Sequence, residues 1–329
     1  MPDDNYDALL VLSFGGPEKP EDVIPFLENV LRGRNVPRER MLEVAEHYYH
    51  FGGKSPINDQ NRALIAALEN LLAHEGPHIP IYWGNRNWHP LLADTLRQMR
   101  ADGIRRAMGF VTSAYSSYSG CRQYREDIGR AQAAVGEGAP EIIRAPIFNA
   151  HPGFIEANVD HLRQTLANFV TPPHVAFTAH SVPQFMADTS SYVQQLNETA
   201  KLVSEAAGIT DWKVVYQSRS GPPTQPWLTP DIGDHIREIH TSGVRELVIA
   251  PIGFISDHME VLYDLDTEAA ELCQELGIRM VRAKTAGTHP AFVRMIRELL
   301  FTPGRICPPD CCPTPVSTRP TQATVRPGG

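Results

Sequence analysis

The sequence predicts an α/β protein of two doubly wound domains, each with a four-stranded parallel sheet flanked by helices, and a cysteine-containing C-terminal tail. Three observations support this prediction. Short runs rich in Val, Ile and aromatic residues recur along the chain, segments of helical length and period separate them, and the composition changes to Pro, Thr, Cys and Gly after about residue 301. Alternating strands and helices are typical of parallel sheets with both faces covered by helices.

The predicted strands divide evenly between the two halves of the chain. Four apolar runs precede residue 148, namely Ala8–Ser13, Ile79–Trp83, Arg106–Thr112 and Glu141–Ile147. Four follow it, namely His174–Thr178, Trp212–Gln217, Glu246–Ile252 and Ile278–Arg282. Helices are expected between them, for example at Ile57–Ala73, Gly153–Phe169, Val193–Ala207 and Glu260–Leu276. The elements repeat although the sequence does not, so we expect two similar domains that face one another.

The domain boundaries follow from this division. We expect an N-terminal domain over residues 1–148, a C-terminal domain over residues 149–301 and a tail over residues 302–329. The last stretch of the tail, from about Thr314, has the composition of a disordered segment.

Composition and charge exclude several classes of protein. With 30 Lys and Arg against 38 Asp and Glu, the formal net charge is −8, which argues against a surface that binds nucleic acid. No apolar run approaches the roughly 18 residues needed to span a bilayer, and the N-terminus lacks the pattern of a secretion signal. We therefore expect a soluble cytoplasmic protein.

The strand ends are where ligands bind in open parallel sheets, at the point where the strand order reverses. His180 and Glu260 each follow a strand end that is expected to flank this point in the second domain. A neutral imidazole can bind a divalent metal or accept a proton, and a neighbouring carboxylate can do the complementary task. By position alone, a helix-capping histidine and a solvated first-turn acid explain the two residues equally well.

The residues after Glu260 favour a cation site. Glu260, Asp264 and Glu268 recur every four residues on one predicted helix, so three carboxylates line one face. Like charges at this spacing cost a few tenths of a kcal/mol per pair, and a row of hard oxygen ligands could pass a divalent cation inward. A solvated acidic face is the alternative.

Aromatic and hydroxyl side chains gather near the predicted strand ends and loops of the first half. Flat aromatic surface with scattered hydroxyls suits a large planar ligand, and arginines could pair with its carboxylates. For each tyrosine taken singly, a place at the edge of the core is the simpler explanation. The residues concerned are Phe14, Tyr48, Tyr49, Tyr115, Tyr118, Tyr124, Ser55, Ser113, Ser116, Arg32 and Arg34.

The five cysteines are too few and too unevenly placed for a disulfide framework. The tail offers three thiols, Cys307, Cys311 and Cys312, and a fourth would complete an iron-sulfur or a zinc site. A tail that folds back could reach Cys121, whereas Cys273 lies on an amphipathic helix and is expected to be a small buried hydrophobe.

The sequence lacks the motifs of two common classes of nucleotide-binding protein. Phe14-Gly15-Gly16-Pro17 after the first strand is not the G-x-G-x-x-G of a dinucleotide-binding dehydrogenase, and the chain has no phosphate-binding P-loop. A thiol nucleophile formed by Cys121 and His180 has only weak support, because no local signature surrounds the cysteine.

Motifs along nearly the whole chain, from residue 8 to about 300, resemble the ferrochelatase family, and in particular its actinobacterial branch. They occur in the family's order and are highly specific. The stretches are Leu12-Ser13-Phe14-Gly15-Gly16-Pro17, Gly52-Gly53-Lys54-Ser55-Pro56, Arg86-Asn87-Trp88-His89-Pro90, Ser113-Ala114-Tyr115-Ser116-Ser117-Tyr118-Ser119-Gly120-Cys121, Ala179-His180-Ser181-Val182-Pro183, Tyr216-Gln217-Ser218-Arg219, Pro226-Trp227-Leu228 and Ser256-Asp257-His258-Met259-Glu260-Val261-Leu262-Tyr263-Asp264.

The resemblance implies two Rossmann-like domains of the chelatase type with a porphyrin between them. It implies a metal-insertion pair of His180 and Glu260, which are also metal ligands, with Asp264 and Glu268 as the acidic ladder. Some relatives have a metal-ligating Tyr where this chain has Phe14, so the resemblance implies that the role is vacant or falls to Tyr118 first and Tyr115 second. The implied porphyrin contacts are Ser55, Tyr124, Tyr118, Tyr115, Phe14, Arg32 and Tyr48, and the implied 2Fe-2S ligands are Cys121, Cys307, Cys311 and Cys312.

The implied activity is insertion of Fe²⁺ into coproporphyrin III during haem biosynthesis, by a lyase that holds a 2Fe-2S cluster. Protoporphyrin IX is the alternative substrate, and a cobalt or nickel tetrapyrrole chelatase or a non-catalytic tetrapyrrole carrier is the alternative function. The resemblance also allows transient contact with neighbouring enzymes of the haem pathway. Residue patterns alone leave open which of His180 and Glu260 accepts the pyrrole protons.

Overall fold

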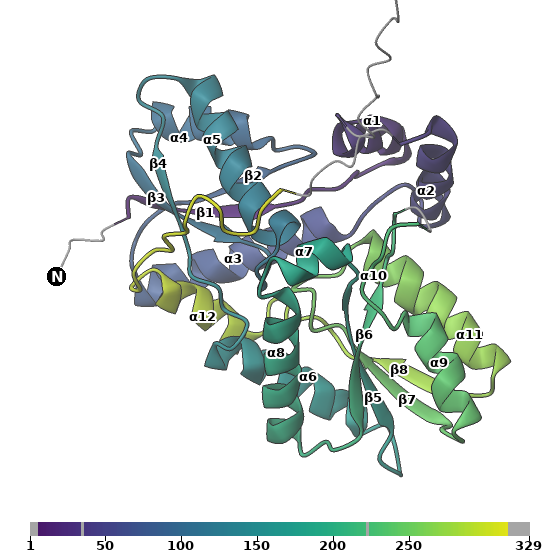
Figure 1. The fold of residues 1–329 in the computed structure, drawn as a ribbon. Coiled ribbons are helices and arrows are strands. Elements are labelled where there is room, and N and C mark those ends of the chain that lie inside the picture. Colours follow the sequence, from purple (N-terminus) through teal and green to yellow (C-terminus); the bar gives the residue numbers. More distant parts are fainter. Residues whose placement is uncertain (1–5, 34–35, 222–223, 315–329) are drawn as a thin grey trace, which may run out of the picture.

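Two four-stranded parallel sheets, one in each half of the chain, form the centre of the protein (Figure 1). The computed structural model describes residues 6–33, 36–221 and 224–314. The strand orders are β2-β1-β3-β4 and β6-β5-β7-β8, so the order reverses between β1 and β3 and between β5 and β7 as predicted. The strands are β1 (Ala8–Ser13), β2 (Ile81–Asn85), β3 (Arg106–Val111), β4 (Glu141–Arg144), β5 (His174–His180), β6 (Trp212–Gln217), β7 (Glu246–Ala250) and β8 (Arg279–Arg282).

Helices cover both faces of each sheet, and the prediction of the α/β fold class is confirmed. Among the described residues, no helix is long and apolar enough to cross a membrane. The helices are α1 (Pro20–Leu31), α2 (Arg38–His50), α3 (Ile57–Glu75), α4 (Leu92–Ala101), the π-helix η1 (Tyr118–Arg122), α5 (Gln123–Val135), α6 (Pro152–Leu166), α7 (Gln184–Asp188), α8 (Tyr192–Ala207), α9 (Ile232–Thr241), α10 (Met259–Tyr263), the π-helix η2 (Asp264–Ala269), α11 (Ala270–Glu275) and α12 (Pro290–Leu299).

The strands are buried on both sides because neighbouring residues point to opposite faces. In β1, Leu10 packs with α4 and α5, whereas Leu9 packs with α3 and α12. In β5, Ala176 packs with α9 and η2, whereas Phe177 packs with α6 and α8. Continuous apolar runs therefore form the strands, and polar residues begin where the strands end.

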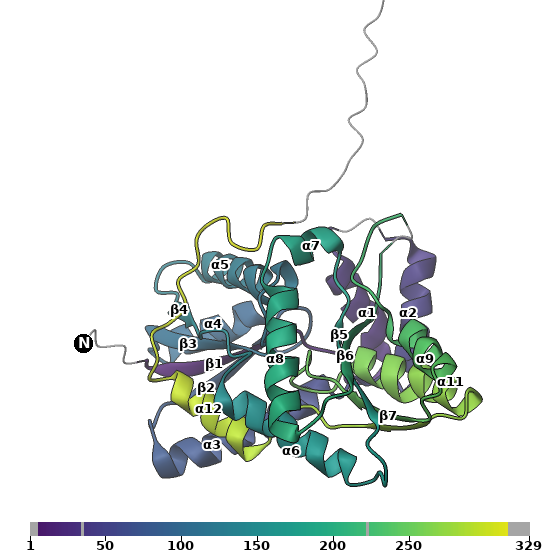
Figure 2. The same ribbon diagram turned by 60° about the horizontal axis from the view of Figure 1, so that its bottom comes forward.

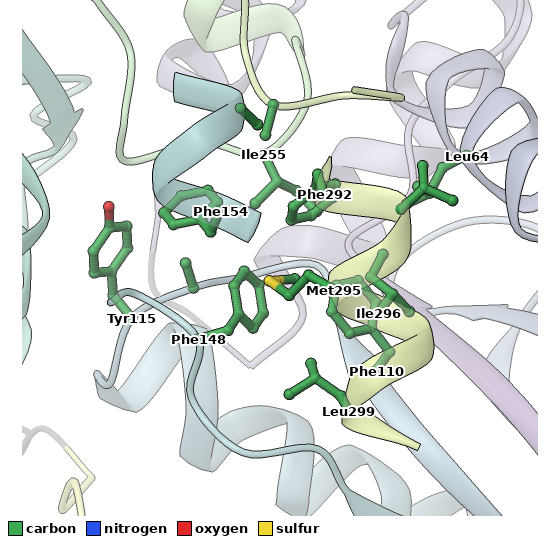
Figure 3. Close-up of a cluster of buried hydrophobic side chains, with 14 of the residues drawn as sticks. Leu64, Phe110, Tyr115, Phe148, Phe154, Ile255, Phe292, Met295, Ile296 and Leu299 are labelled. Carbon is green, nitrogen blue, oxygen red and sulfur yellow. The ribbon is translucent and has the colours of Figure 1, made fainter. Parts of the chain in front are cut away.

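The last helix, α12, joins the two halves. It packs against α3 of the first half and α6 of the second, as both ribbon views show (Figures 1 and 2). Phe292 of α12 lies in an aromatic cluster with Phe110, Phe148 and Phe154, each at most 2% exposed (Figure 3). One continuous core thus spans the predicted boundary, and the division of the chain at residue 148 stays a prediction.

Candidate active site

His180 and Glu260 lie side by side at the end of the second sheet. His180 is the last residue of β5, and Glu260 lies in the first turn of α10. Nε2 of His180 is 3.4 Å from Oε2 of Glu260, and the two side chains are 32% and 49% exposed. The structure thus brings the predicted pair together where solutes can reach both side chains.

Backbone contacts fix the orientation of this pair. Nδ1 of His180 is hydrogen-bonded to the Ser181 carbonyl, so Nδ1 carries a proton and Nε2 faces Glu260. The Tyr192 hydroxyl donates to the His180 carbonyl over 2.9 Å. His258 caps α10, because its Nδ1 accepts a hydrogen bond from the backbone N–H of Glu260 over 3.2 Å.

Each member of the pair stabilises the charge of the other. Burial opposes protonation of His180, but the Glu260 carboxylate and the Ser181 carbonyl outweigh it and raise the pKa of the imidazole to about 9. Burial also opposes ionisation of Glu260, yet His180 and His258 lower the pKa of its carboxyl to about 2. At neutral pH the resting pair is therefore an imidazolium beside a carboxylate.

Two further carboxylates follow Glu260, on a helix whose geometry changes at Asp264. The prediction of one continuous α-helix from Glu260 to Leu276 is wrong, because the π-helix η2 separates α10 from α11. A π-helical turn holds more residues than an α-helical turn, so it rotates Glu268 relative to the predicted face. The carboxylates remain coupled nonetheless, since Glu260 and Glu268 both raise the pKa of Asp264.

Asp264 lies against the end of β6. Its carboxylate accepts hydrogen bonds from the Ser218 hydroxyl and, over 3.4 Å, from the amide of the buried Gln217. The same amide donates to the Glu260 carbonyl over 3.0 Å. Burial and the neighbouring carboxylates raise the pKa of Asp264 to about 7, against the effect of the Ser218 hydrogen bond.

Ser218 has a backbone φ of +62°, which is costly for a residue other than glycine. The left-handed turn lets the chain leave β6 while the Ser218 hydroxyl keeps its hydrogen bond to Asp264.

Glu268 also has a raised pKa. The partial burial of its carboxyl group, and then the charges of Asp231 and Glu271, raise this pKa, so Glu268 also favours its protonated form.

Helix α2 of the first half faces α10, as Figure 1 shows. The His47 and Tyr263 rings stack with their centroids 3.7 Å apart and their planes 8° from parallel. Burial, and then the charge of Glu260, raise the pKa of Tyr48. Tyr48 therefore lies within the electrostatic field of Glu260.

Phe14 and Tyr124 both lie against the guanidinium group of one arginine. The guanidinium carbon of Arg86 is 5.6 Å from the Phe14 ring centroid and 4.8 Å from that of Tyr124. Nε of Arg86 pairs with Asp127 over 2.6 Å. Sequence reasoning missed Arg86 as a member of this cluster, although the Arg86–Pro90 motif after β2 marked its neighbourhood.

The other predicted porphyrin contacts differ in accessibility. Ser55 is 3% exposed and packs against Gly16, while Arg32 is exposed beside Asn29. Arg34 lies outside the described residues. Tyr118 is half-buried, and its hydroxyl donates to Glu126 over 3.1 Å.

The placement of Tyr115 corrects one expectation. Its side chain is 2% exposed, packs edge-on against Phe154 and Tyr192, and donates its hydroxyl to the Ile252 carbonyl over 2.8 Å (Figure 3). The hydroxyl is occupied inside the core, so Tyr115 is left out of the porphyrin contacts and of the candidate iron ligands.

Comparison with known proteins identifies the family. Residues 6–302 match the family model described as Ferrochelatase. The chain belongs to the ferrochelatase family. It is 56% identical to a ferrochelatase of Rhodopirellula baltica, over 97% of this chain and 98% of that one. It is 48% identical to the coproporphyrin III ferrochelatase of Streptomyces coelicolor, covering 94% and 93%, and 50% identical to that of Mycobacteroides abscessus, covering 90% and 88%.

Solved structures show the same chelatase fold. SirB from Bacillus subtilis with Fe³⁺ aligns with a TM-score of 0.56 and 12% identity, over 90% of this chain and 96% of that chain. The sirohydrochlorin chelatase SirB with cobalt aligns with a TM-score of 0.53 over the same shares. As a ferrochelatase family member, the chain is a lyase of haem biosynthesis with a porphyrin and Fe²⁺ as substrates.

In this ferrochelatase family member the tail passes β4 and α5 and brings three cysteines to Cys121 of η1 (Figure 2). Arg144 donates to the sulfurs of Cys121 and Cys307 over 3.1 and 3.2 Å. The sulfurs of Cys311 and Cys312 are 3.7 Å apart, and Cys312 is hydrogen-bonded to Cys121. The sulfurs of Cys121, Cys312 and Cys311 thus follow one another in contact, and Cys307 is linked to Cys121 through Arg144. Cys273 is buried on α11 as predicted.

Some features of these four cysteines fit a bound metal cluster, and one does not. A tetrahedral metal with bonds to sulfur of about 2.3 Å holds its sulfurs about 3.8 Å apart, close to the spacing of Cys311 and Cys312. The Cys312 hydrogen bond, Arg305 and Arg144 lower the pKa of Cys121, while the same hydrogen bond raises the pKa of Cys312, so the thiolate of this pair is favoured on Cys121. Within the described ranges, however, no three His, Cys, Asp or Glu side chains already have the geometry of a metal site.

Proposed function

We propose that this enzyme inserts Fe²⁺ into coproporphyrin III, with His180 and Glu260 as the metal-insertion pair and Asp264 and Glu268 on the path of the incoming cation. The observation that carries the proposal is the ion pair at the end of β5, with a second carboxylate directly behind it. Relatives that carry the name coproporphyrin III ferrochelatase support this porphyrin as the substrate.

The difference between the two pKa values supports different tasks for the two residues. Two pyrrole protons must leave as Fe²⁺ enters the ring. A carboxyl with a pKa of about 2 holds protons poorly at neutral pH, so Glu260 binds the cation. Fe²⁺ beside Glu260 replaces the positive charge of His180 and lets the imidazole release its proton to water. Neutral His180 then accepts one pyrrole proton through Nε2, passes it to water, and in the same way accepts the second.

The first half of the chain provides the wall for the porphyrin. Phe14, Tyr124 and Tyr48 supply aromatic surface, Ser55 and Arg32 supply polar contacts, and Tyr118 is the proposed partner on the far face of the ring. Tyr118 must exchange its hydrogen bond with Glu126 for that role.

The same proposal includes a 2Fe-2S cluster on Cys121, Cys307, Cys311 and Cys312. The contacts that link the four cysteines and the thiolate character of Cys121 support it. When bound, such a cluster supplies a one-electron redox centre. It would also tie the tail to η1, the segment that carries Tyr118.

An anaerobic metallation assay tests the activity. Purified protein is mixed with Fe²⁺ and either coproporphyrin III or protoporphyrin IX, and loss of free-porphyrin fluorescence is followed. We expect turnover with coproporphyrin III, loss of at least 100-fold in His180→Ala, and parent activity in the control His74→Ala, which changes an exposed histidine on α3.

Each alternative has its own outcome in this assay. Faster turnover of protoporphyrin IX would overturn the proposed substrate, and faster insertion of Co²⁺ or Ni²⁺ would overturn the proposed metal. Porphyrin binding without turnover would identify a carrier. For the cluster, we expect visible absorption and bound sulfide in the parent and in Cys273→Ala, and neither in Cys307→Ala.

A further inference from the structure

Arg144 is a buried cation whose hydrogen bonds the metal-insertion chemistry does not use. It is the last residue of β4, the edge strand of the first sheet, and is 8% exposed. One guanidinium nitrogen donates to the Cys121 sulfur over 3.1 Å and to the Cys121 carbonyl over 3.2 Å. The other donates to the Cys307 sulfur over 3.2 Å.

The backbone around Arg144 holds the tail in place as well. The backbone N–H of Arg305 donates to the Arg144 carbonyl over 2.8 Å, so the tail pairs with the free edge of β4 just before Cys307. Further along, Arg125 donates to the carbonyls of Pro308 and Pro309 over 3.1 and 3.2 Å. Arg144 therefore contacts one thiol from η1 and one from the tail, at a point where both segments are anchored.

A cation in this position has a defined effect on a bound cluster. An oxidised 2Fe-2S cluster with four thiolates carries a net charge of about −2, and reduction by one electron adds a further negative charge. Hydrogen bonds to the sulfurs and nearby positive charge stabilise the more negative, reduced form. Arg144 donates hydrogen bonds to two of the four proposed ligand sulfurs, those of Cys121 and Cys307.

We propose that Arg144 is a positioning residue for the cluster, which holds the Cys121 and Cys307 thiolates together and raises the reduction potential of the cluster. The inference rests on the proposed 2Fe-2S cluster. It adds to the four proposed ligands a residue that sets the reduction potential of the cluster. The same hydrogen bonds favour assembly, because they bring together two ligands that are far apart in the sequence.

Three variants of the full-length protein test the inference. Arg144→Gln removes the charge and keeps one amide donor, whereas Arg144→Lys keeps the charge and loses the paired donors. Arg125→Gln is the matched control, since it removes a cation that contacts tail carbonyls and no sulfur. The readouts are the midpoint potential from an optical redox titration, the reduced-cluster electron paramagnetic resonance signal, and iron and sulfide content.

We expect the ratio of reduced to oxidised cluster at a fixed potential to fall at least tenfold in Arg144→Gln, a shift of 59 mV for a one-electron couple. Arg144→Lys should shift less in the same direction, and Arg125→Gln should stay near the parent. A folded Arg144 variant that is purified without its cluster would support the holding role. A parent with a cluster and unchanged potentials in both Arg144 variants would overturn the inference alone, whereas a parent with no cluster would overturn the proposed cluster and the inference together.

Discussion

The raised pKa of Asp264 predicts that protons compete with Fe²⁺ for the enzyme near neutral pH. Burial and the charges of Glu260 and Glu268 raise this pKa to about 7, so above that value the carboxylate is charged and attracts the cation. The charged fraction is about 10% at pH 6 and about 90% at pH 8 by simple titration. We therefore expect ionisation of Asp264 to contribute a roughly ninefold rise of kcat/KM for Fe²⁺ between these values, in addition to the rise that deprotonation of His180, with its pKa of about 9, contributes.

The assay is anaerobic metallation at saturating porphyrin, with Fe²⁺ varied at half-unit steps from pH 6 to 8. Asp264→Asn should lower kcat/KM for Fe²⁺ and make its pH profile less steep, because the amide has no proton to lose and only the contribution of His180 remains. Glu275→Gln, which changes an exposed acid on α11 outside the proposed cation path, is the control and should keep the parent profile. A profile in Asp264→Asn as steep as that of the parent would refute the assignment, as would a rise of kcat/KM on acidification.

Three further predictions concern the hydrogen bond on Asp264, the core shared by the two halves, and Tyr115. Ser218→Ala removes a hydrogen bond that lowers the pKa of Asp264, so the midpoint of the same pH profile should move to higher pH; a midpoint that stays or falls would contradict this. Phe292→Ala should lower the free energy of unfolding by about 3 to 5 kcal/mol in denaturant titrations, whereas Phe301→Ala, at a side chain that is 65% exposed, should change it little. Tyr115→Phe should cost about 1 to 2 kcal/mol of stability with kcat unchanged, and a large loss of kcat would return Tyr115 to the list of iron ligands.

The strands and the position of the site were predictable because they depend on local patterns. Runs of apolar residues with no polar alternation indicate strands buried on both faces, and the structure has all eight. The reversal of strand order then places His180 and Glu260 at one end of the second sheet. Strand limits moved by a few residues: β4 ends at Arg144, ahead of Pro146, which has no N–H to donate to a ladder.

The remaining features depend on contacts that no local pattern encodes. A π-helical turn has the same residue preferences as the α-helix around it, so the irregularity at Asp264 could not be seen in the spacing of the carboxylates. Tyr115 and Tyr118 follow the same strand, and only the packing of α6 and α8 shows that the first points into the core. Arg144 contacts Cys307 across the fold, although the two residues are 163 positions apart in sequence.

The position of α12 has a consequence for synthesis of the protein on the ribosome. Leu9, Met108 and Phe110 of the first sheet need Phe292, Ile296 and Leu299 of α12 to complete their cover. These partners are made after every described strand, so the nascent first half carries an exposed apolar face until α12 has left the exit tunnel. Fragments that end before residue 290 should therefore aggregate and depend on chaperones for solubility. The core of the first half is complete only when α12 packs against it.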